Sequence, residues 1–253
     1  MNYDFQRASL MKRAPAWLLD MILLVIVAVG IVAGLAYAVD MDAHSEALDA
    51  IYVRYETEYG VDFGITAEEA EKLTEEQLAV YEAANEALSK DPEAQKTYEL
   101  FVNLTLVVLS GGILGAFLLL EFLVPLWLKN GQTLGKKVFG VALMRKDGIK
   151  VTPFMMFARA ILGKFTTETM IPLLLIIAAA FGIMGLDGLL FGGLFLLAQV
   201  IVTLVTRDKT AIHDLMACTV AVDLSSQMIF DSPEAMEAYH SDIITDEAEP
   251  DCE

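Results

Sequence analysis

Residues 13–40 read RAPAWLLDMILLVIVAVGIVAGLAYAVD. After Asp20 the stretch carries no charge before Asp40, and such an apolar run is close to the ~20 residues that cross the hydrocarbon core of a bilayer. Three similar runs occupy residues 100–120, 169–186 and 188–206. The sequence therefore predicts an integral membrane protein in contact with the lipid bilayer, with four spanning helices.

The formal net charge of −18 comes from two acidic segments. Residues 40–99 hold 17 acids and 4 bases, and residues 223–253 hold 10 acids and no Lys or Arg. Nucleic-acid binding needs a basic face, so we expect none. The two cysteines, Cys218 and Cys252, fit neither a metal-site spacing nor a disulfide framework. We expect no metal and no cofactor.

Basic residues collect on one side of the predicted spans. They precede the first span, fill the segment between the second and third, and follow the fourth. Because Lys and Arg are enriched in cytoplasmic loops, we expect a multi-pass protein of the cell (inner) membrane with both termini in the cytoplasm.

The predicted fold class is an all-α membrane protein: a four-transmembrane-helix bundle with a cytoplasmic β-hairpin and a helical extracytoplasmic insertion. Its predicted segments are a cytoplasmic N-terminus with the first transmembrane helix (1–40), the acidic insertion (41–99), the second transmembrane helix (100–128), a cytoplasmic hairpin with an interfacial helix (129–165), a transmembrane hairpin of the third and fourth helices (166–206), an interfacial segment (207–222) and an acidic cytoplasmic tail (223–253).

The acidic insertion carries helix-start signals. Thr66 and Thr74 are each followed three residues later by Glu or Gln, the pattern of a capping box. Asp91-Pro92 places a cap before a proline at the first helical position, so one helix is expected to run from there into the second span. This insertion is interpreted either as a solvated acidic cap or as a vestibule that concentrates cations.

The basic segment after the second span predicts short β structure. Asp147-Gly148 lies between two β-prone runs, 136–145 and 149–152, which is typical of a β-hairpin. Residues 153–164 predict an amphipathic interfacial helix, with Arg159 and Lys164 at the lipid headgroups.

No motif in the chain predicts catalysis, and we expect that the protein is not an enzyme. GQTLGKK at 131–137 has three residues between its glycines and no Ser or Thr after the lysine pair, so it does not match a phosphate-binding loop. It is interpreted as a turn whose lysines reach the headgroups. His213 precedes Asp214, but no recognisable nucleophile motif accompanies them.

Acidic residues inside the predicted spans are the most informative candidates. Asp20 lies seven residues after Arg13, and Glu121 lies seven residues before Leu128 at the end of a span that runs the opposite way. Both carboxylates are therefore expected about 10 Å inside the cytoplasmic boundary. A charge at the centre of a span costs about 2.5–3.5 kcal/mol, so these positions indicate a role. Glu168 starts the third run and is expected to be shallower.

Two interpretations of these charges stay open. In the structural one, Arg13 pairs with Asp20 or Asp214 and holds helices together. In the functional one, Asp20 and Glu121 bind a proton or a cation, as ionisable groups within spans often do. His213, Glu168 and Arg159 are secondary candidates for the same site.

Several motifs together resemble the RDD family of bacterial membrane proteins. They are RAPAWLLD at 13–20, NGQTLGKK at 130–137, GVALMRKDG at 140–148, ARA at 158–160 and IHDLMACTV at 212–220. The family is named for one arginine and two aspartates, and the resemblance implies that these are Arg13, Asp20 and Asp214. The match leaves out the insertion at 41–99 and the acidic tail.

Some members of that family are implicated in sodium/proton exchange. The resemblance therefore implies monovalent cation/proton (Na⁺/H⁺-type) transport, with Na⁺, K⁺ or H⁺ as partners. Because four spans make a thin wall for an ion path, we expect a homodimer. The alternative is a non-transporting membrane scaffold or accessory subunit whose acidic loop or tail binds a partner protein.

Overall fold

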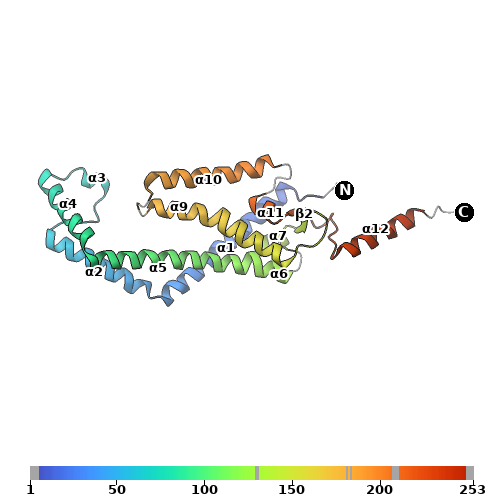
Figure 1. The fold of residues 1–253 in the computed structure, drawn as a ribbon, viewed down its shortest axis with the longest axis horizontal. Helices are drawn as coiled ribbons and strands as arrows, with labels where there is room; N and C mark the ends of the chain where they lie inside the picture. The colour runs from blue at the N-terminus through green and yellow to red at the C-terminus, as the bar shows by residue number, and fades with distance from the viewer. Residues whose placement is uncertain (1–5, 129–130, 181, 183, 207–210, 249–253) are drawn as a thin grey trace. The chain divides into compact units, whose positions relative to one another are not determined.

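The structure of the protein is a computed structural model that describes residues 6–128, 131–180, 182, 184–206 and 211–248. Within these ranges four helical stretches are long and apolar enough to cross a membrane, which confirms the predicted all-α membrane fold (Figure 1). The four are α1 (Leu10–Ala38); α5, η1 and α6 (Pro92–Phe117, Leu118–Leu123 and Val124–Leu128); α8, η2 and α9 (Pro153–Phe157, Ala158–Met170 and Ile171–Ala180); and α10 (Gly185–Val205).

The chain forms two compact units. The first contains Met1–Ala28 and Ile113–Glu253, and the second contains Val29–Gly112. The sequence-predicted acidic insertion accounts for most of the second unit. All of the charged candidate residues belong to the first.

The second unit is helical, as its capping signals predict. Besides parts of α1 and α5 it contains α2 (Met41–Tyr59), α3 (Ala67–Ala70) and α4 (Glu75–Lys90). Thr74 and Gln77 form a reciprocal capping box at the start of α4. Thr66 and Glu69 exchange the same pair of bonds before α3. The helix that starts at Pro92 continues into the second span, also as predicted.

In the first unit the third and fourth spans form the predicted hairpin, in which α9 and α10 lie antiparallel (Figure 1). The fourth span begins at Gly185, the first residue of α10. Before it, the Gly182 amide donates to the Ala179 carbonyl at 3.0 Å, and the Met184 amide donates to the Ala178 carbonyl at 3.2 Å. Positions 181 and 183 lie outside the described residues. A Cβ added at Gly188 would lie 2.8 Å from the carbonyl oxygen of Leu175. The glycine therefore allows α10 to pack closely against α9.

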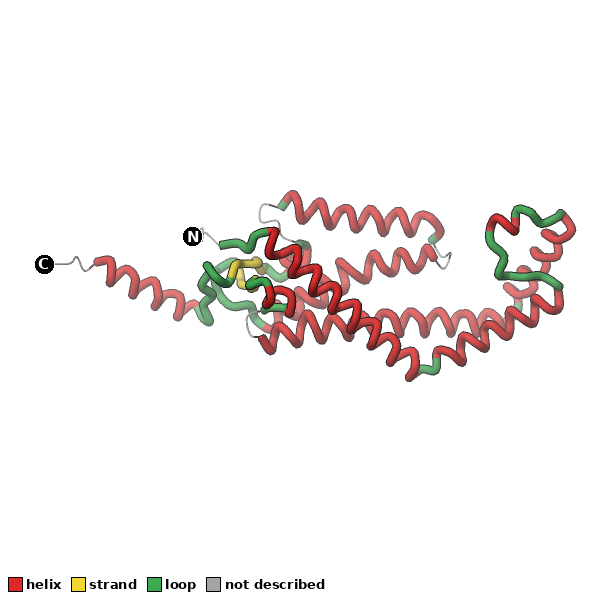
Figure 2. Tube along the Cα trace, turned by 180° about the vertical axis from the view of Figure 1, so that it is seen from behind, coloured by secondary structure: helices red, strands yellow, loops and turns green. Residues whose placement is uncertain are grey.

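A small antiparallel sheet, drawn in yellow in Figure 2, contacts α7 (Leu134–Val138) and α11 (Ile212–Met216). Strand β1 (Val141–Arg145) pairs with β2 (Thr219–Asp223), with Val141 opposite Asp223. The first four residues of each strand are buried. Their alternating side chains pack on two faces, one around Leu143 and Met156 and the other around Met144 and Val222.

This pairing corrects the predicted β-hairpin. Asp147-Gly148 does form a tight turn, closed by the bond from the Gly148 amide to the Arg145 carbonyl. The returning chain makes only a single bridge, Met144 to Lys150. It stops there because Thr152 caps α8 and Pro153 starts that helix. Residues 219–223 take the place of a second hairpin strand. Residues 207–210 lie outside the described ranges.

Three further helices belong to the first unit. They are α7 (Leu134–Val138), α11 (Ile212–Met216) and α12 (Pro233–Ala248). The acidic tail is therefore helical over Pro233–Ala248. Lys150 pairs with Asp231 at 2.9 Å just before α12.

Candidate functional site

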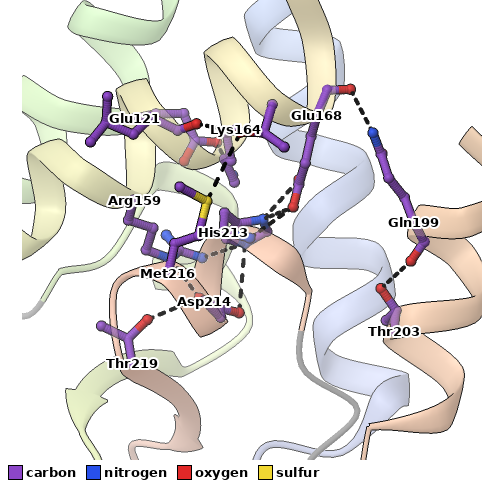
Figure 3. Close-up of polar contacts among 12 residues, drawn as sticks. Glu121, Arg159, Lys164, Glu168, Gln199, Thr203, His213, Asp214, Met216 and Thr219 are labelled. Atoms are coloured by element: carbon purple, nitrogen blue, oxygen red, sulfur yellow. Dashed lines mark hydrogen bonds and ion pairs between the residues drawn. The ribbon is translucent and has the colours of Figure 1, made fainter. Parts of the chain in front are cut away.

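Charged side chains from several elements meet inside the first unit (Figure 3). Most of these side chains are buried. Most of them also lie on helices that are apolar enough to cross the membrane. The cluster, called the charge cluster below, contains Asp20, Glu121, Lys136, Arg159, Lys164, Glu168, His213 and Asp214.

Two stretches of π-helix carry much of this cluster. Glu121 lies in η1, and Arg159, Lys164 and Glu168 lie in η2. Hydrogen bonds in a π-helix join residues five apart, and such segments are frequent at functional sites. Arg159 and Lys164 are five residues apart, so the widened turn brings both onto the same side of the helix. This side faces the partners of both cations, Asp214 and Glu121.

Arg159 and Asp214 form the most enclosed ion pair of the cluster. The Arg159 Nε donates to Asp214 Oδ1 at 2.6 Å, and the two side chains are 5% and 3% exposed. Thr219 Oγ1 donates to the same carboxylate oxygen. Burial alone would raise the pKa of Asp214, but the Arg159 guanidinium lowers it far below its ordinary value. Asp214 is therefore a permanent anion in the native state.

His213 joins Asp214 to the third span. Its Nδ1 lies 2.8 Å from Glu168 Oε2, and its backbone amide donates to Glu168 Oε1 at 2.9 Å. Burial and the Arg159 charge lower the pKa of His213, so this imidazole is neutral near pH 7. Gly163 permits the contact, because a Cβ there would lie 2.5 Å from the Cβ of His213.

Glu121 has one satisfied oxygen and one free oxygen. Its Oε1 accepts a hydrogen bond from Lys164 Nζ at 2.5 Å. Its Oε2 is buried and has no hydrogen-bond partner among the described residues. Buried polar atoms are nearly always paired, so an unpaired carboxylate oxygen is a position where a proton or a cation can bind.

Asp20 has different surroundings. Its two carboxylate oxygens accept hydrogen bonds from the Thr133 hydroxyl and from the Gly135 amide at 2.7 Å. A Cβ at position 135 would lie 2.2 Å from the Ala16 carbonyl oxygen, so only glycine lets α7 approach α1 this closely. Asp20 thus fastens the start of α7 to the first span.

Lys136 is held over this junction. Its Nζ lies 3.9 Å from Asp20 Oδ2 and donates to the Thr133 hydroxyl at 3.2 Å. Burial, together with the charges of Arg159 and Lys164, lowers the pKa of Lys136 to about 7. A lysine with such a pKa changes its charge in the physiological range.

Several sequence predictions need correction at this site. Residues 153–164 do not form a separate interfacial helix but the first half of the third span. Arg159 is buried and Lys164 is mostly buried, each in an ion pair, because carboxylates from other elements face them. The Lys136 side chain is only 12% exposed, whereas Lys137 is exposed.

The predicted pair of Arg13 with Asp20 or Asp214 is likewise wrong. Asp214 pairs with Arg159, and Asp20 is bound by Thr133 and Gly135. Asp20 and Glu121 do line one small pocket together, which agrees with the depth argument. Sequence reasoning missed Lys136 and Lys164 as members of the site. The nearest signal was their position next to conspicuous glycines, Gly135 and Gly163.

Within the described ranges, no three side chains of His, Cys, Asp or Glu converge on a metal position. No curated protein and no solved structure shows significant similarity to the chain. The sequence model of the RDD family matches residues 7–218. This match includes every residue of the charge cluster and most of the chain, and the protein belongs to the RDD family.

Proposed function

We propose that the protein exchanges a monovalent cation for a proton across the membrane, with Glu121 as the ion-binding carboxylate. The observation that carries the proposal is the buried, unpaired Oε2 of Glu121. Ionisable groups within membrane spans commonly mark ion pathways. The oxygen lies beside Lys164, whose ammonium already occupies one side of the carboxylate.

The charge balance of the cluster supports this role. Its four acids are Asp20, Glu121, Glu168 and Asp214, and its three cations are Lys136, Arg159 and Lys164. With His213 neutral, one negative charge remains. Uncompensated charge is costly in a membrane, so uptake of one proton or one small cation is favourable.

Lys136 provides a coupling step. When the Lys136 ammonium loses its proton near neutral pH, the cluster has a further negative charge and its attraction for a cation increases. When Lys136 regains the proton, its charge disfavours the bound cation. One proton released for one cation taken up is the stoichiometry of an exchanger.

In this proposal Asp20 is a positioning residue. Both of its oxygens already accept hydrogen bonds from α7 and its cap, which holds Lys136 in place. The cytoplasmic location of both termini, the cell membrane as the site and a homodimer as the working form remain part of the proposal. An exchanger needs no catalytic group, and we propose that the protein is not an enzyme.

The test is ion flux in proteoliposomes that contain a pH-sensitive dye. We expect addition of Na⁺ or K⁺ to one side to drive proton movement, and Glu121→Gln to abolish it. Glu99→Gln is the matched control, since Glu99 is an exposed acid of the same membrane-crossing stretch. Flux that persists in Glu121→Gln, or is absent from the wild type, would contradict the proposal.

A second candidate is a scaffold that binds a partner protein. The observation in its favour is that Val29–Gly112 forms a compact unit of its own, with many exposed acids. Deletion of residues 41–90 distinguishes the two candidates. A scaffold loses partner capture and never shows flux, whereas an exchanger shows flux in its intact form.

A further inference from the structure

A cavity of about 390 Å³ opens between the first and fourth spans, inside the first unit. Its lining includes residues of the first turns of α1 and the last turns of α10, together with every member of the charge cluster except Glu121. The wall residues used below are Leu10, Arg13, Trp17, Val200 and Leu204. Helix α1 begins at Leu10 and α10 ends at Val205. The cavity therefore lies where two spanning helices reach one membrane boundary, at the level of the headgroups.

Arg13 lines this cavity without an ion pair to any described residue. Every other cation in the cavity wall has a carboxylate within 4 Å: Lys136 has Asp20, Arg159 has Asp214 and Lys164 has Glu121. A guanidinium provides a planar fork of donors that matches phosphate geometry. Among the described residues, Arg13 is thus a cation of the cavity wall that has no carboxylate partner and that suits a phosphate group.

The sides of the cavity are apolar and open toward the bilayer. Trp17 is 58% exposed, and Leu204 on the opposite wall is 68% exposed. Leu10 and Val200 are exposed beside them. Exposed apolar side chains on membrane-spanning helices contact lipid, and tryptophan is enriched at headgroup depth. A ligand here needs a phosphate at one end and a hydrocarbon chain at the other.

We infer that this cavity binds an anionic phospholipid, with its phosphate on Arg13 and an acyl chain between Trp17 and Leu204. Basic pockets between membrane helices are known to hold acidic lipid headgroups. The lipid phosphate pairs with Arg13, and the acyl chain covers the open apolar side of the cavity. The inference does not depend on ion exchange, since it rests on Arg13 and the cavity walls and not on Glu121.

The chain supplies its own reporter for this site. It contains two tryptophans, Trp17 and Trp127, so Trp127→Phe leaves Trp17 as the only indole. The full-length Trp127→Phe protein is placed in phosphatidylcholine nanodiscs with increasing fractions of brominated phosphatidylglycerol, and Trp17 quenching is recorded. A parallel series uses brominated phosphatidylcholine. We expect the anionic lipid to reach half-maximal quenching at a clearly lower mole fraction.

Arg13→Gln in the same background is expected to raise the half-quenching fraction of phosphatidylglycerol about fivefold, the effect of one cation near an anionic surface. Lys12→Gln is the matched control, because Lys12 is the adjacent cation and is already paired with Asp223 at 2.6 Å. It should leave the curve unchanged. Arg13→Lys is expected to fall between the wild type and Arg13→Gln.

Equal quenching by the two lipids would overturn the inference, and so would an unchanged curve in Arg13→Gln. An equal shift in Lys12→Gln would also overturn it, because general surface attraction would then explain the preference. If Arg13→Gln does not fold, the lipid comparison in the parent protein and Arg13→Lys still decide the question.

Discussion

The acidic residues of the two units differ in burial. In Val29–Gly112 the acids are mostly exposed to solvent, and even the Arg54 pairs with Asp91 and Glu93 involve a half-exposed guanidinium. In the first unit Asp214 and Glu121 are buried, each with a cation within 2.6 Å. Water can replace a lost partner in the second unit but not in the first. The same residue type thus adds solubility in one unit and builds a site in the other.

The largest difference between the units should be the loss of stability when an arginine of an ion pair is replaced. Arg159→Met leaves the buried Asp214 carboxylate without its cation, and we expect a loss of about 3–5 kcal/mol of stability. Thermal unfolding in detergent, followed by tryptophan fluorescence, measures it. The control Arg54→Met removes a half-exposed pair and should leave the midpoint unchanged.

Adding Asp214→Asn to Arg159→Met should recover much of this loss, because no isolated charge then stays buried. If Arg54→Met destabilises the protein as much as Arg159→Met, the contrast between the two units is wrong.

Glycine-to-alanine substitutions in the two units should change the free energy of unfolding by smaller amounts and in opposite directions. Gly135→Ala places a methyl group 2.2 Å from the Ala16 carbonyl oxygen, and overpacking of this kind costs about 1–3 kcal/mol. Gly34→Ala, on α1 in the second unit, meets no atom within 4 Å and should be neutral or stabilise the helix by up to about 1 kcal/mol. The same unfolding experiment compares them, and a stable Gly135→Ala protein would refute the close fit of α7 on α1.

Stability measured at a series of pH values tests the lowered pKa of Lys136. Its pKa is about 7 in the native state and 10.5 in an ordinary environment, so between these values the unfolded chain binds the proton and the folded chain does not. Stability should therefore rise with pH above about 7, by at most about 1.4 kcal/mol per pH unit. In Lys136→Met this contribution disappears. Parallel curves for wild type and variant between pH 7 and 9 would show that Lys136 keeps its ordinary pKa.

Features that depend only on residues near one another in the chain were predicted correctly from the sequence. Apolar run lengths identified the four spans, and Thr74 with Gln77 predicted the start of α4. The partner of β1 lies more than 70 residues along the chain, in Thr219–Asp223. The local Asp147-Gly148 turn suggested a nearer partner, and no local rule could choose the distant one.

The charge cluster was only partly predictable, for a geometric reason. Asp20, Glu121 and Asp214 stood out as acids within apolar sequence, and the burial of all three agrees with that. Arg159 and Lys164 are five residues apart, and in an α-helix such residues point in different directions. The π-helical turn of η2 brings them together, and sequence periodicity gives no sign of that turn.

The most direct test of the central claim, that Glu121 holds the exchanged ion, is equilibrium binding of radioactive sodium to the purified protein at several pH values. We predict that one Na⁺ binds per chain at about pH 8.5, where Lys136 is neutral, and that binding falls steeply below the Lys136 pKa of about 7. Glu121→Gln should bind none. Sodium binding that is equal in the wild type and Glu121→Gln, or absent from the wild type at every pH, would contradict the account.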